Sequence, residues 1–222
     1  MAEEIRTVHA PVADPAALGL AAFALTTFLL SAHNAGWAPD YIWIGPAFFY
    51  GGLAQLLAGM WEFRNRNIFG CTAFSTYGGF WLSLGLFVLL VTFSKPVAAA
   101  LGAAGVSKDL GWFLLAFAIF NTYMLLWSTR ITAAVFGVFL LLEITEIILF
   151  IGFFLAGAGN SAGPSWIKIG GYLGIATAAI AWYTSAAVVV NNMAGRVVAP
   201  VGRPLWPEAT VPAAQSQPVT RA

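Results

Sequence analysis

Long apolar stretches separated by short polar joints dominate the hydrophobic pattern of this chain. Each of the six stretches is long enough to cross a bilayer as a helix, because a span takes roughly 20 residues at about 1.5 Å rise per residue. They run over Ala16–Trp37, Ile42–Trp61, Ile68–Ser94, Leu110–Thr129, Ile131–Gly157 and Pro164–Val190. The pattern predicts an all-α membrane protein with six transmembrane helices.

Composition supports this prediction. Charged residues make up 9% of the 222-residue chain and hydrophobic residues 60%, and the mean hydropathy is +0.82. A soluble protein carries about 25% charged residues. No long hydrophilic insert separates the stretches, which predicts a single six-helix transmembrane domain over 16–191. An N-terminal segment (1–15) precedes it, and a tail (192–222) that is flexible beyond about 203 follows.

The distribution of basic residues predicts the orientation. With six spans, both termini share one side, and that side holds seven of the ten Lys and Arg residues. The seven are Arg6, Arg64, Arg66, Arg130, Arg196, Arg203 and Arg221, and the other three are Lys95, Lys108 and Lys168. Cytoplasmic loops hold the excess of basic residues. Both termini are therefore expected in the cytoplasm, with the chain in the inner membrane of a bacterium or archaeon.

Polar side chains within the spans are costly in lipid and are therefore candidates for function. Gln55 falls in the middle of the second span, where its amide either clamps two helices or offers a donor to a passing anion. Asn34 lies near the end of the first span, where an interfacial cap is an equal alternative to a solute contact. Thr27 either contributes to a path or bonds back to a carbonyl of its own helix.

Two acidic residues interrupt the fifth span. Glu143 and Glu146 are three residues apart, so both carboxyls lie on one helical face. Two ionised carboxylates in hydrocarbon repel each other and lose hydration, so the pair needs a proton, water or a polar neighbour. The alternatives are proton carriage, a hydrogen-bonded clamp between helices or subunits, and a di-metal site. No Glu-x-x-His motif accompanies the pair, which disfavours the metal.

The sequence shows no signature of an enzyme. It contains no metal-ligand cluster, nucleophile elbow or phosphate-binding loop, so we expect no catalytic residue, metal or cofactor. The ten basic residues are spread too thinly to form a patch for nucleic acid.

Several motifs resemble the acetate uptake transporter family, also called the succinate–acetate permeases. They are DPAALGL (Asp14–Leu20), HNAGW (His33–Trp37), FFYGGLAQLLAGMWEFRNRNIFGCTAFSTYGGFW (Phe48–Trp81) and NNMAGRVVAPVG (Asn191–Gly202). The first departs from the family's Asn-Pro-Ala-Pro-Leu-Gly-Leu motif, since Asp14 replaces Asn and Ala17 replaces the second Pro. The resemblance covers roughly residues 14–202 and is looser in the fourth and fifth spans.

The resemblance implies six transmembrane helices, cytoplasmic termini and a homohexamer in which each subunit has its own path. It implies transport of acetate, and in some members succinate, through a narrow constriction of Phe, Tyr and Leu. By position in the motifs these residues fall on Phe23, Tyr77 and Leu142. Acids at Glu143 and Glu146 are not part of the family pattern, and they would supply proton coupling, alter selectivity or face a neighbouring subunit.

A neck of two aromatic rings and a leucine suits a carboxylate with a methyl tail. Hydrated ions cross a dry neck poorly, and Tyr77 is able to donate a hydrogen bond to a carboxylate oxygen. Acetate is almost wholly ionised at neutral pH, with a carboxyl pKa of roughly 4, so it needs polar partners on the wall. Candidates for this role are Thr27, Asn34, Gln55, Ser75 and the helix start at Leu18, Gly19 and Leu20.

Two other functions fit the same pattern. A channel for small neutral solutes such as acetic acid, urea or ammonia also needs narrow apolar walls and no cation in the spans. A membrane scaffold or sensor would need only the small residues that pack the helices, but it leaves Phe23 and Tyr77 without a role.

Overall fold

The computed structural model describes residues 12–206, which contain helices and no strand. The helices are α1 (Ala16–Asn34), α2 (Ile44–Phe48), the π-helix η1 (Phe49–Ala54), α3 (Gln55–Arg64), α4 (Ile68–Phe93), α5 (Lys95–Ser128), α6 (Ala133–Gly157) and α7 (Gly163–Ala194). Five of them, α1, α4, α5, α6 and α7, are long and apolar enough to cross a membrane. The all-α membrane fold is confirmed. Residues 1–11 and 207–222 of the predicted terminal segments lie outside the described residues.

The second predicted span is not one regular helix. From Ile44 to Arg64 the chain forms α2, then η1, then α3 without an intervening loop. Gly51 of η1 lies against α1 and α4, where an added Cβ would be 2.6 Å from Thr26 Oγ1 and 2.8 Å from Trp81 Cδ1. Glycine thus permits a close approach at the point where the helix widens into a π-turn. Gln55 begins α3 directly after this turn.

Local signals set the ends of the other helices. Asn67 Oδ1 accepts the Gly70 amide at 3.0 Å at the start of α4, and Thr132 Oγ1 accepts the Val135 amide at 3.2 Å at the start of α6. The fourth span was predicted to begin at Leu110, but α5 begins at Lys95. The segment 95–109, which was expected to join the third and fourth spans, is helical because it is rich in alanine. Gly102, with φ of 61°, bends it.

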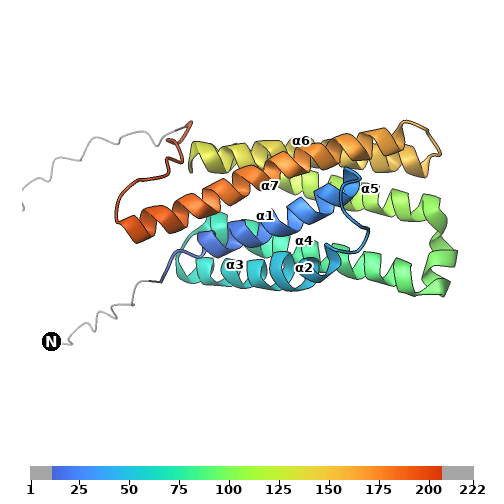
Figure 1. Ribbon diagram of the computed structural model, residues 1–222, viewed down its shortest axis with the longest axis horizontal. Coiled ribbons are helices and arrows are strands. Elements are labelled where there is room, and N and C mark those ends of the chain that lie inside the picture. Colours follow the sequence, from blue (N-terminus) through green and yellow to red (C-terminus); the bar gives the residue numbers. More distant parts are fainter. Residues whose placement is uncertain (1–11, 207–222) are drawn as a thin grey trace, which may run out of the picture.

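The long helices run along the length of the molecule (Figure 1). Their contacts form a closed ring in which each element packs mainly against two neighbours. Around the ring the order is α1, α7, α6, α5, α4 and the α2–η1–α3 segment, which packs back on α1. Glycines lie where the helices meet. An added Cβ on Gly78 of α4 would be 2.8 Å from the Leu56 nitrogen, and one on Gly171 of α7 would be 2.5 Å from the Ala35 nitrogen. Small residues therefore let backbones approach as closely as lipid-embedded helices require.

The segment after α7 folds back across the start of α6 to the end of α5. The Ala134 amide donates to Val201 O at 2.9 Å, and the Trp206 amide donates to Thr129 O at 3.0 Å. The Arg130 guanidinium lies over the Trp206 ring, 4.7 Å from its centroid. Residues up to Trp206 are therefore held by partners that are far away in sequence, and the flexibility predicted beyond about residue 203 stays a prediction.

Replacing Trp206 with alanine is expected to release this segment. A cation–π contact at an exposed site contributes about 0.5–1 kcal/mol, so the effect should be local. Backbone amides of residues 197–206 should exchange hydrogen faster, measured by mass spectrometry in detergent. Leu205→Ala is the control, since Leu205 is similarly exposed at 55% against 59% for Trp206. Equal exchange in the two variants would contradict a role for the Arg130 contact.

Candidate functional site

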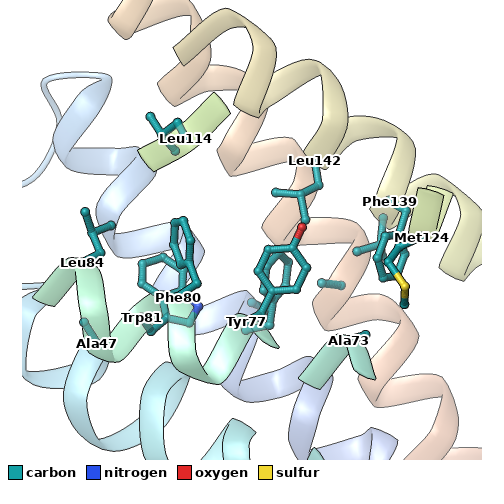
Figure 2. Close-up of a cluster of buried hydrophobic side chains, with 14 of the residues drawn as sticks. Ala47, Ala73, Tyr77, Phe80, Trp81, Leu84, Leu114, Met124, Phe139 and Leu142 are labelled. Carbon is teal, nitrogen blue, oxygen red and sulfur yellow. The ribbon is translucent and has the colours of Figure 1, made fainter. Parts of the chain in front are cut away.

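The three residues of the predicted constriction lie together in the centre of the ring. Phe23 of α1, Tyr77 of α4 and Leu142 of α6 are each about 95% buried, with exposed fractions of 5%, 4% and 6%. All three line one small cavity of about 20 Å³. The Phe23 and Tyr77 rings meet edge to face at a centroid distance of 5.7 Å, and Figure 2 shows the Tyr77 hydroxyl directed toward Leu142.

Gln55 is the polar residue in the wall of this cavity. It is 1% exposed, and its Oε1 atom has no hydrogen-bond partner in the described part of the chain. The remaining lining residues are apolar, namely Leu20, Ala73, Phe74, Val138 and Phe139. A buried amide oxygen without a partner is costly. An oxygen accepts hydrogen bonds and does not serve an anion, so the clamp between helices and the contact with a passing solute both stay predictions for Gln55.

A second, much larger cavity of about 590 Å³ lies toward the C-terminal ends of α1 and α4. Its lining includes Leu84, Leu114 and Leu149, which are buried, and His33 and Asn34, which are half-buried. Leu84 follows Tyr77 by seven residues, or about 10 Å along a helix. The wide cavity and the small one are thus separated by roughly two helical turns.

Aromatic rings fill the space between the two cavities. Phe80 packs against Tyr77 at 6.0 Å and against Phe117 at 4.8 Å between ring centroids. Figure 2 shows Phe80 and Trp81 between Leu84 and Tyr77. Aromatic rings therefore separate the wide cavity from the small one.

The two acidic residues of α6 join the neck through a hydrogen-bond network. The Tyr77 hydroxyl lies 2.9 Å from Asn121 Oδ1 and 3.3 Å from Glu146 Oε1. Asn121 Nδ2 donates to Glu143 Oε2 at 2.7 Å, and Thr122 Oγ1 donates to Glu143 Oε1 at 2.8 Å. The network connects α4, α5 and α6, as a clamp between helices would. It also places a carboxyl beside the neck, as proton carriage would require.

Tyr77 and Glu146 differ in whether their polar atoms have hydrogen-bond partners. The Tyr77 hydroxyl was expected to donate to a substrate, but in the structure it faces Asn121 and Glu146. Glu146 is 2% exposed, and its Oε2 atom has no hydrogen-bond partner within residues 12–206. Asn121, which sequence reasoning missed, is fully buried. The sequence feature that could have identified Asn121 is its position as a single amide side chain within the apolar fourth span.

The structure brings some of the other candidates to the path and leaves others away from it. Asn34 lines the large cavity and Leu20 the small one. Gly19 packs against the Phe74 ring, which would lie 2.8 Å from an added Cβ, and Leu18 is 45% exposed. Of the helix start, Leu20 alone is among the residues that line the small cavity.

Two hydroxyls fall outside both cavity linings. Thr27 is buried and its Oγ1 atom has no partner among the described residues, whereas the neighbouring Thr26 donates back to Ala22 O at 3.0 Å. Ser75 faces α3, where its nitrogen would lie 2.6 Å from a Cβ added to Gly59. Ser75 therefore belongs to the contact between α3 and α4.

Over residues 12–206 no group of three or more His, Cys, Asp or Glu side chains is placed to hold a metal ion. The site consists of the small cavity with its mostly apolar lining, the buried Gln55 amide, and the carboxyls of Glu143 and Glu146.

Comparison with known proteins gives the site a context. The model of the GPR1/FUN34/yaaH family matches residues 2–203. Acetate permease A of Emericella nidulans is 40% identical over 203 residues, which cover 87% of this chain and 67% of that protein. The succinate-acetate/proton symporter SatP of Escherichia coli K12 is 36% identical over 192 residues, covering 86% of this chain and 96% of the symporter.

A solved structure shares the fold. The structure of the bacterial acetate channel SatP superposes with a TM-score of 0.75 at 34% sequence identity, and covers 86% of this chain and 100% of that one. The resemblance inferred from the motifs is confirmed. This chain is a member of the GPR1/FUN34/yaaH family.

Proposed function

We propose that this protein transports small monocarboxylates, chiefly acetate and in part succinate, across the membrane. The path in each subunit runs through the neck of Phe23, Tyr77 and Leu142. The observation that carries the proposal is the meeting of these three residues, from three helices, on one cavity of about 20 Å³. Two similar proteins are named for acetate transport, and nothing in the family names suggests an enzyme.

The chemistry of the neck suits acetate. Apolar walls accept the methyl group, and a small cavity excludes a hydrated ion. The anion still needs a polar partner, since desolvating it alone is prohibitive. Gln55 lines the small cavity, and its side-chain NH₂ group supplies that partner, because the anion needs a hydrogen-bond donor. No lysine or arginine lies in the neck lining, so the anion is not trapped.

We propose further that transport is linked to protons through Glu146. A similar protein is named a succinate-acetate/proton symporter. Glu146 is buried beside Tyr77, and one of its oxygens is unpaired. A carboxyl at this position changes the charge beside the anion path when it gains or loses a proton.

Topology and assembly are part of the same proposal. The α2–η1–α3 segment serves as the sixth span, and the start of α1 and the end of α7 lie at one end of the bundle (Figure 1), as an even number of crossings requires. We place that end in the cytoplasm. Thr122 is exposed in the last third of α5, beside the half-buried Glu143. A subunit contact, as in the implied homohexamer, would shield these groups from lipid. The bacterial or archaeal inner membrane stays a prediction, because a fungal relative exists.

Labelled acetate flux into proteoliposomes tests the function, with voltage and pH gradient set separately. We expect flux well above that of protein-free liposomes, with saturation and competition by unlabelled acetate. Flux that responds to voltage identifies an anion path. Flux of ammonia or urea without acetate flux would instead support a channel for neutral solutes and contradict the proposal.

A further inference from the structure

Asn121 of α5 is a buried polar residue that touches the neck without lining it. Its side chain is fully enclosed. Its amide oxygen lies 2.9 Å from the Tyr77 hydroxyl, and its amide nitrogen donates to Phe139 O at 3.0 Å and to Glu143 Oε2 at 2.7 Å. All the hydrogen-bonding atoms of this side chain are therefore engaged.

The partners of the amide fix its orientation. A backbone carbonyl and a carboxylate oxygen accept hydrogen bonds, so the NH₂ group of Asn121 must face Phe139 and Glu143. The amide oxygen is then left to face Tyr77, and the tyrosine hydroxyl must be the donor. Its one proton is directed to Asn121 at 2.9 Å, because the alternative acceptor, Glu146 Oε1, is farther away at 3.3 Å.

We infer that Asn121 is a positioning residue of the constriction, which ties the Tyr77 hydroxyl to α5 and so holds the Tyr77 ring across the path. This inference rests on the proposed transport function. It adds a specificity role for a residue outside the neck.

The tie matters because it adds a directional contact to the apolar packing of the ring. Tyr77 packs between Phe23 at 5.7 Å and Phe120 at 5.6 Å, measured between ring centroids. Such packing is non-directional, whereas a hydrogen bond demands a defined distance and angle. Helices α4 and α5 also contact each other less extensively than α5 and α6 do. Asn121 thus fixes the end of the ring at a weakly packed seam of the bundle.

A double-mutant cycle on selectivity tests the role. The proteins are wild type, Asn121→Leu, Tyr77→Phe and the double variant, and the readout is the ratio of acetate flux to butyrate flux in proteoliposomes. Leucine has a similar size but no hydrogen bonds, so the ratio should fall several-fold as the freed ring admits the larger acid. Tyr77→Phe should lower it similarly. The double variant should show no more change than Tyr77→Phe alone, because Asn121 acts through the hydroxyl.

Two further variants separate positioning from general packing. Thr122→Val is the matched control, since Thr122 binds Glu143 but does not contact Tyr77, and it should keep the wild-type ratio. Glu143→Gln is the second variant, since it changes a partner of the Asn121 amide nitrogen but leaves the Tyr77 contact and an acceptor for Asn121 in place. It should also keep a ratio near that of wild type.

The inference is overturned if Asn121→Leu and Tyr77→Phe add independently, or if Thr122→Val relaxes selectivity as much as Asn121→Leu. Thermal unfolding of the same four cycle proteins in detergent is a readout that does not need transport. Non-additive losses of Tm support the tie, and additive losses overturn it, even where Asn121→Leu assembles poorly. If the wild-type protein transports no acetate but the four cycle proteins show coupling in Tm, the proposed function is wrong and the hydrogen bond between Asn121 and Tyr77 is still supported.

Discussion

Glu146→Gln is expected to remove most of the dependence of acetate flux on pH between about pH 5 and pH 8. Glutamine has the shape of a protonated carboxyl and still offers an oxygen to the Tyr77 hydroxyl, which lies 3.3 Å from Glu146 Oε1 in the wild-type structure. It carries no charge at any pH. The wild-type flux should rise as pH falls, because protonation removes a negative charge beside an anion path. The variant should stay near the high level throughout.

The measurement is labelled acetate flux in proteoliposomes over this pH range, after subtraction of the flux through protein-free liposomes, which neutral acetic acid crosses. Glu143→Gln is the matched control. Glu143 is half-buried and paired with Asn121 and Thr122, so its loss should leave a pH-dependent flux. The titratable groups of the network facing Glu146 are Tyr77 of α4 and Glu143 of α6, with Tyr123 of α5 beyond them.

The opposite outcome for Glu146→Gln has a defined meaning. A wild-type pH profile combined with loss of the assembled protein in mild detergent would make the acidic pair a clamp between α4, α5 and α6. Proton linkage through Glu146 would then be wrong.

Leu142→Ala is expected to widen the neck and to lower the ratio of acetate flux to succinate flux by about tenfold. Truncation of a buried leucine leaves space that the surrounding structure fills in part only. At a neck whose cavity measures about 20 Å³, that space decides whether a four-carbon acid passes. A selectivity change of 1–3 kcal/mol, about 10- to 200-fold, is the usual range for one or two methylenes in an apolar site, and we expect the lower end.

Leu149→Ala is the matched control, since Leu149 lies two helical turns further along α6, is buried to a similar degree and lines the wide cavity. It deletes the same atoms and should cost similar stability, but the ratio of acetate to succinate flux should stay as in wild type. An unchanged ratio in Leu142→Ala, with normal assembly, would remove Leu142 from the neck. Equal changes in both variants would indicate a general loosening of the bundle.

The family motifs singled out distant residues that the structure brings together. Phe23, Tyr77 and Leu142 come from three helices, and their positions followed from motif resemblance and not from any spacing within one helix. The hydrophobic pattern likewise predicted the spanning helices, because lipid requires long runs of apolar side chains and intrahelical hydrogen bonds. Each motif and each apolar run lies within a short stretch of the chain, and so both could be recognised from the sequence.

The tertiary structure decided which polar residues line a cavity. Ser75 and Gln55 looked alike as polar residues in apolar spans, but Ser75 packs against Gly59 whereas Gln55 lines the neck. The direction of a side chain on a helix that is buried all round depends on its neighbours, and periodicity carries no signal for it. The π-turn before Gln55 was equally hidden, since it depends on how closely Gly51 approaches Thr26.

By itself, the sequence determined the class of the molecule and its family, and it predicted the spanning segments and the residues of the neck. The tertiary structure alone revealed Asn121 as the link between Tyr77 and the acidic pair, and Trp206 as a partner of Arg130. The physical reason is the same in both cases. The composition and periodicity of a sequence predict which segments are buried in lipid or protein. A hydrogen bond or a ring contact between residues far apart in the chain forms only after the helices have packed.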